Sequence, residues 1–363
     1  MYKQADTERP AIACFKEVLK ICPMSLEAAQ ALMELGVKSR EVSEIMIDCT
    51  SQFDWLSQWI QGYSAFYNHD YANCIHTLKQ LEDSQSLLRN NLHMLVTIGQ
   101  AQHYSGQFVN AAFTLQRVHR LDPNHLPGMD ILAVLYAKER KIKELEQLAN
   151  KLMNVTEEAP EPWIAMGYYC YANKKGTKAM YFGQKACMVQ SKSVEALLLK
   201  GNLLLDLKKL HHSMDHFREA VSIAPYRYET HKGLVDCYLA QSRHREAISV
   251  ATTACKQLSN SQRALTLFAT VLAKDPLNMS TAKAKTLLEK ALNADPTHLP
   301  AIYLLAEIYE QELELEKAKE LLNKALKTQS TGKLHQMLGT IFSKYSSFRV
   351  CKVRNLKSLS IAS

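Results

Sequence analysis

Glycine and proline are scarce in this sequence. Its 363 residues include 12 glycines and 10 prolines, both below the average usage of about 7% and 5%. Sandwiches and barrels need many turns built from these two residues between their short strands. Their scarcity argues against an all-β fold.

Long apolar runs are absent as well. Charged residues interrupt every hydrophobic stretch before about 18 residues, the length that a membrane-spanning helix requires. The first residues, Met1 to Asp6, contain no apolar segment of the kind found in signal peptides. A hydrophobic share of 47% nevertheless excludes disorder along most of the chain. We therefore expect a folded protein without a membrane partner.

Paired cysteines are missing too. The nine cysteines are scattered along the chain, their number is odd, and no two of them form a C-x-x-C segment. This distribution is typical of buried thiols in a reducing compartment. We therefore expect the protein in the nucleus and cytoplasm, without disulfides.

Signatures of catalysis and of cofactor binding are also lacking. The sequence contains no G-x-S-x-G, H-E-x-x-H or G-x-x-x-x-G-K-[ST] segment. His212 and His216 are four residues apart on one predicted helix, but a zinc site needs three or four ligands and no cysteine pair lies nearby. We predict no enzyme activity, no cofactor, no metal site and no small-molecule substrate.

The net charge gives little support for nucleic-acid binding. Lysine and arginine outnumber aspartate and glutamate by 44 to 36, a formal charge of +8. Basic and acidic residues are interleaved along most of the chain, which is typical of a solvated helical surface. Residues 349–363 carry four bases and no acid, and so account for half of the excess. No nucleic-acid partner is expected.

The sequence does contain a repeat of 34 residues. Ala220, Phe217 and Gly201 precede Pro225 by 5, 8 and 24 residues, which is the spacing of tetratricopeptide repeats. Stepping by 34 keeps this phase without insertion, and repeats begin at residues 92, 126, 160, 194, 228 and 262. Six repeats in one phase predict an all-α fold, a tetratricopeptide-repeat αα-superhelix or solenoid, in which each repeat is a pair of antiparallel helices.

Helix packing explains the repeated residue types. Gly or Ala at repeat position 8, such as Gly167 and Gly201, lets the two helices of a repeat approach closely. A larger residue there would overpack the contact. Proline at position 32, such as Pro123 and Pro225, ends the second helix. No repeat buries its apolar face alone, so stability is a sum of contacts between neighbours.

The phase divides the chain into segments of different regularity. Eight tetratricopeptide repeats are expected over residues 55–331. A phase slip of three residues falls at 274–280, in the turn between the two helices of the repeat that begins at 262. Residues 26–54 are expected to form a degenerate repeat made of a short pair of helices.

Both ends are expected to be incomplete repeats. Residues 1–25 fit only the second helix of a repeat, because Met1 falls at position 10, inside the first helix. Residues 332–348 fit only a first helix, and 349–363 are expected to form a basic, irregular tail. Apolar residues near both ends should then be half-covered and prone to associate: Ile12, Phe15, Val18, Leu19, Leu338, Ile341 and Phe342.

Several strings resemble one family. They are DWLSQWI (54–60), EPW (161–163), ALLLKG (196–201), HFREA (216–220), DCYLA (236–240), KAKTLL (283–288) and LHQMLG (334–339). Together they resemble the subunit 7 family of the anaphase-promoting complex (cyclosome), a tetratricopeptide-repeat family, over about residues 9–345. The resemblance implies a non-catalytic scaffold and protein-interaction subunit of a ubiquitin ligase that supports cell division, bound to sister tetratricopeptide subunits.

The sequence departs from this family at both ends. The N-terminal repeats that the resemblance associates with dimerisation are missing, so homodimerisation is doubtful for this chain. The last repeat's second helix and the acidic tail beyond it are replaced by the basic residues 349–363. The resemblance therefore does not extend to contacts made by those segments.

The expected binding surface is the concave groove of the superhelix, formed by positions 2, 5, 9, 12 and 13 of each first helix. These positions are both polar and apolar, which suits an extended peptide or a partner helix. The candidate partner-binding residues are Tyr168, Tyr171, Glu195, Leu198, Asn202, Leu205, Asp206, Glu229, Lys232, Asp236, Tyr303 and Glu307.

A free adaptor that binds short peptides in this groove is the alternative function. Chaperone-binding relatives of the fold resemble one another in a carboxylate clamp with Lys at position 5 and Asn at position 9. Here Asn202 is paired with Leu198 at position 5, and Lys232 is paired with Asp236 at position 9. The missing clamp argues against the chaperone form of the adaptor, while other peptide ligands stay open.

Overall fold

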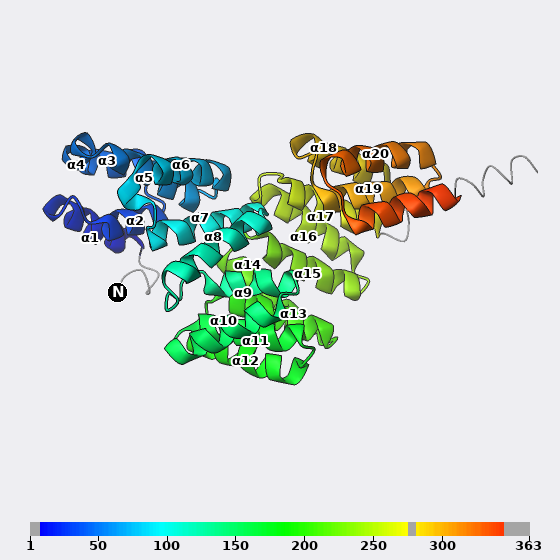
Figure 1. The fold of residues 1–363 in the computed structure, drawn as a ribbon, viewed down its shortest axis with the longest axis horizontal. Helices are drawn as coiled ribbons and strands as arrows, with labels where there is room; N and C mark the ends of the chain where they lie inside the picture. The colour runs from blue at the N-terminus through cyan, green and yellow to red at the C-terminus, as the bar shows by residue number, and fades with distance from the viewer. Residues whose placement is uncertain (1–7, 275–280, 345–363) are drawn as a thin grey trace, which may run out of the picture. The chain divides into compact units, whose positions relative to one another are not determined.

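The computed structural model describes residues 8–274 and 281–344, and every regular element in these ranges is a helix (Figure 1). The chain divides into two compact units, an N-terminal unit of residues 1–203 and a C-terminal unit of residues 204–363. We describe each unit by itself. Most of the expected phase slip at 274–280 and the whole basic tail at 349–363 lie outside the described residues.

The N-terminal unit consists of short helices followed by regular helix pairs. The first four helices are α1 (Glu8–Ile21), α2 (Leu26–Glu34), α3 (Ser39–Ile45) and α4 (Ile47–Gln52). The pairs are α5 (Asp54–Tyr67) and α6 (Tyr71–Ser84), α7 (Leu92–Ser105) and α8 (Phe108–Leu121), α9 (Met129–Lys138) and α10 (Ile142–Val155), and α11 (Pro160–Ala172) and α12 (Gly176–Val189), with the 3-10 helix η2 (Ser86–Leu88) after α6.

The C-terminal unit continues this alternation. Helix α13 (Val194–Asp206) begins in the first unit and ends in the second. It is followed by α14 (Leu210–Ile223), α15 (Tyr228–Ala240), α16 (His244–Gln257), α17 (Gln262–Ala273), α18 (Thr281–Ala294), α19 (Leu299–Gln311) and α20 (Leu315–Thr328). A further helix covers residues 332–344. Among the described helices, none is both long enough and apolar enough to cross a membrane.

Most first helices begin at the residue where the 34-residue phase starts a repeat. This holds for α7, α11, α13, α15, α17 and α19. Helix α9 instead begins at Met129, three residues after the repeat start at 126. The reason is Gly128, whose φ of +81° is left-handed and cannot belong to a right-handed helix.

The degenerate repeat differs from the expected pair of helices, because residues 26–54 form three short helices. The break between α3 and α4 lies at Met46, whose backbone (φ −97°, ψ 18°) leaves the helical region. Its side chain is fully buried in one core cluster with Val42 and Leu32. Burial of Met46 therefore accompanies the interruption of the helix.

The expected half-covered faces at the ends are only partly present. Val18 and Phe342 are exposed by 42% and 47%. Leu19 and Ile341, by contrast, are 0% and 1% exposed, so the expectation was wrong for them. Leu19 lies in the same core cluster as Leu32, because α1 packs against both α2 and α3.

The turn between the two helices has the same backbone conformation in all seven repeats whose position 15 the structure describes. Position 15 is left-handed, with φ between 56° and 94°, at His69, Gly106, Arg140, Lys174, Lys208, Ser242 and Leu313. The following residue donates its N–H back into the first helix, as Lys175 does to the Cys170 carbonyl at 2.9 Å. This is the Schellman pattern, which satisfies carbonyls at a helix end. Glycine occupies the position once in these seven turns.

Small residues bring neighbouring helices into contact. A methyl group on Gly99 of α7 would lie 2.7 Å from Leu115 of α8, and one on Gly167 of α11 would lie 2.5 Å from Leu199 of α13. On Gly233 of α15 it would meet the ring of Phe217 of α14, a fully buried side chain. The space at these glycines is therefore filled by the neighbouring helix.

Gly233→Ala should lower the free energy of unfolding by roughly 1–3 kcal/mol, because the rigid Phe217 ring must shift to admit the methyl group. Gly339→Ala is the matched control, since nothing lies within 4 Å of a methyl group there. It should raise stability by up to about 1 kcal/mol, as alanine is the better helix former. Urea denaturation followed by circular dichroism measures both, and equal effects would contradict the packing argument.

Candidate functional site

The structure places the twelve candidate groove residues at different depths. Tyr168, Glu195 and Leu198 are buried, with 6%, 6% and 4% of their surface exposed. Tyr171, Asn202, Leu205, Glu229, Asp236 and Tyr303 are half-buried, and Asp206, Lys232 and Glu307 are exposed. The three buried residues therefore contribute to packing more than to an accessible surface, and Tyr168 is part of the largest core cluster of the N-terminal unit.

The N-terminal unit has a further carboxylate on the first-helix face. Glu161 lies in the first turn of α11, at repeat position 2, and is half-buried. Burial raises the pKa of its carboxyl group, although its own backbone N–H opposes the shift. Its Oε2 atom makes no hydrogen bond with any residue that the structure describes. Burial without a full set of partners makes the charged form of Glu161 costly.

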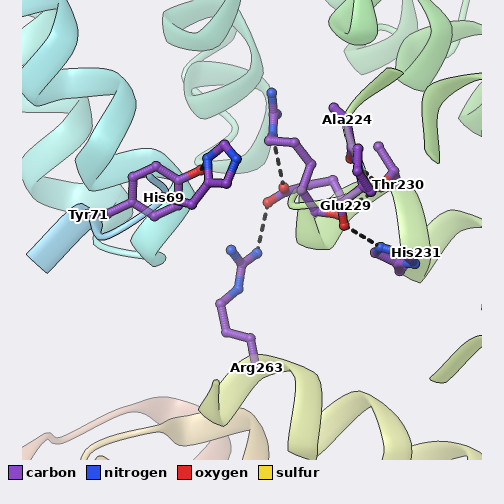
Figure 2. A network of polar contacts seen from close by, with 9 residues as sticks. His69, Tyr71, Ala224, Glu229, Thr230, His231 and Arg263 are labelled. Carbon is purple, nitrogen blue, oxygen red and sulfur yellow. Dashed lines mark hydrogen bonds and ion pairs between the residues drawn. The ribbon is translucent and has the colours of Figure 1, made fainter. Parts of the chain in front are cut away.

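The C-terminal unit brings together an arginine–glutamate network (Figure 2). Arg263 of α17 donates from Nη2 to Oε1 of Glu229 of α15 at 2.8 Å. The Nε atom of Arg227 lies 3.7 Å from Oε2 of the same glutamate. The side chains of Arg227, Glu229 and Arg263 are only 5%, 17% and 13% exposed, so water screens these charges weakly.

An aromatic ring adjoins the same network. The guanidinium of Arg263 lies 4.0 Å from the centroid of the Tyr228 ring, which is cation–π geometry. Burial raises the pKa of Tyr228 to about 12, while the charge of Arg263 opposes the shift. Arg263 therefore connects two consecutive residues of α15 to the start of α17.

Side chains at the start of α15 fix the turn that carries Arg227. The Thr230 hydroxyl donates to the Arg227 carbonyl at 2.7 Å, and His231 Nε2 donates to the Pro225 carbonyl at 2.7 Å. Burial lowers the pKa of His231, although its bond to Pro225 opposes the shift. The lowered pKa favours the neutral imidazole of His231, and this form holds the turn.

Two other groups of candidates lie near charged neighbours. Burial raises the pKa of Asp236, while Lys232 and Lys274 oppose that shift. The Tyr303 hydroxyl is 3.0 Å from Thr331 Oγ1, and Lys333 Nζ lies 4.3 Å from the centre of the Tyr303 ring. The candidates therefore form separate polar groups along the C-terminal unit.

Sequence analysis selected Glu229 as a candidate, left out Arg263 although it lies at the same groove position, and missed Arg227 and Tyr228. A usable signal was present, because Glu229 and Arg263 are 34 residues apart and occupy position 2 of consecutive repeats. Opposite charges at one position of adjacent repeats face each other when the repeats stack. Arg227 gave no such signal, since it belongs to the turn before the repeat.

These groups consist of paired charges, aromatic rings and hydroxyls, and in the arginine–glutamate network they contact one another within the unit. Within residues 8–274 and 281–344, no cluster of three or more His, Cys, Asp or Glu side chains could hold a metal ion.

Glu229→Gln and Arg263→Gln should each lower the free energy of unfolding by about 1–3 kcal/mol, because each weakens a charge-assisted contact with little screening. The double variant should reveal a coupling energy of roughly 0.5–3 kcal/mol. Arg243→Gln is the control, since its ion pair with Glu246 is 42% and 44% exposed and should contribute at most about 1 kcal/mol. Strictly additive single effects in urea denaturation would refute a direct pair.

Asp236→Asn should raise the free energy of unfolding at pH 7. Because burial raises the folded-state pKa of Asp236 above its ordinary value of 3.8, ionisation at neutral pH costs stability. That cost disappears as the pH falls through the folded pKa to below 3.8, so the variant and the native chain should converge there. Denaturation curves at several pH values test this. In a chain that also carries Lys232→Gln, the gain in free energy of unfolding from Asp236→Asn at pH 7 should be larger. A gain that is the same at all pH values would contradict the prediction.

Two stretches of the chain match the description of a known family of repeats. Residues 194–227 and residues 280–339 each match the family described as "Tetratricopeptide repeat". The first match coincides with the repeat that the 34-residue phase assigns to the same residues.

Curated relatives match nearly the whole chain. The Homo sapiens protein named "Anaphase-promoting complex subunit 7" is 37% identical over 342 residues, which cover 93% of this chain and 60% of that protein. The Arabidopsis thaliana protein of the same name is 27% identical over 354 residues, which cover 94% of this chain and 62% of that protein. The chain therefore spans only about three fifths of the length of these relatives.

Solved structures share the fold. The crystal structure of the APC/C hetero-tetramer Cut9-Hcn1 matches with a TM-score of 0.64 and 14% identity, covering 95% of this chain and 68% of that chain. Yeast Tom70 matches with a TM-score of 0.55 and 12% identity, covering 96% of this chain and 87% of that chain. These likenesses concern the fold alone and confirm the expected tetratricopeptide solenoid. The chain is therefore a tetratricopeptide-repeat solenoid, and its curated homologues are the proteins named anaphase-promoting complex subunit 7.

Proposed function

We propose that this chain is a non-catalytic scaffold subunit of the anaphase-promoting complex and binds sister tetratricopeptide subunits in the nucleus and cytoplasm. The observation that carries the proposal is the 37% identity to the human subunit 7 over 93% of the chain. Through such an assembly the chain would support cell-cycle-regulated ubiquitination without taking part in the chemistry.

The first-helix face supplies side chains for this role. Lys232 and Glu307 are exposed, and Tyr171 and Asn202 are half-buried, so partners could reach them without unfolding a helix. The Arg263–Glu229 contact fixes the start of α17 against α15. A partner would meet a surface whose backbone is already ordered, which reduces the entropy lost on binding.

Co-sedimentation tests the assembly. The tagged chain, produced together with the sister tetratricopeptide subunits, should sediment with them as one complex. Lys232→Glu combined with Glu307→Lys should weaken this association by about ten-fold, because both side chains are exposed and reversing their charges opposes a complementary partner. Lys79→Glu, an exposed change on the second helix α6, is the control and should leave it intact.

Two outcomes would overturn the proposal. A chain that folds but sediments with no sister subunit would favour the free adaptor instead. If the charge-reversed variant assembled as well as the control, the first-helix face would not be the surface that binds the sister subunits.

A further inference from the structure

We draw no further inference here: the strongest candidate, the apolar face that Leu338, Gly339 and Phe342 form on the helix of residues 332–344, carries nothing, because nothing in the part of the chain that the structure describes shows what covers it.

Discussion

Close approach of helices at small side chains is the contact on which this structure depends. Leu115 fills the space beside Gly99, Leu199 fills that beside Gly167, and the Phe217 ring fills that beside Gly233. Since a single repeat cannot bury its apolar face, each helix pair is stable only when such contacts join it to its neighbours. The same constraint leaves the outer faces of the helices without a packing role. Those faces are therefore free to vary, which is why exposed residues can be apolar on α8 and polar on α10.

Buried charge gives the C-terminal unit a second kind of contact. Glu229 accepts from Arg263 across 34 residues of sequence, and Arg227 lies on the other oxygen of the same carboxylate. Such contacts are directional, whereas apolar packing is not, so they favour one arrangement of α15 against α17. They also place charge where screening by water is weak, which makes the network costly to break and specific in geometry.

The sequence predicted much of the fold because its period is long and regular. The starts of α7, α11 and α15 follow from the 34-residue phase, and the solenoid is confirmed by the structure and its relatives. Local exceptions were not predictable from the period, since the late start of α9 depends on the backbone of Gly128 and the break between α3 and α4 coincides with burial of Met46 in the core. For the candidate site residues, the repeat position predicted the helix face on which each side chain lies, but not how far that side chain is buried. Whether Glu195 is buried or Lys232 exposed depends on how neighbouring side chains fill the space, which no single position encodes.

The left-handed turn at repeat position 15 has a consequence for how the chain tolerates change. Six of its seven occurrences use a residue other than glycine, and each such residue costs about 1–2 kcal/mol in local backbone preference. The turns are therefore shaped by the helices that they connect. Because these turns are not part of the first-helix face, their residues could be exchanged for glycine to adjust stability without altering that surface. A solenoid built in this way can change its stability without changing its exposed helix faces.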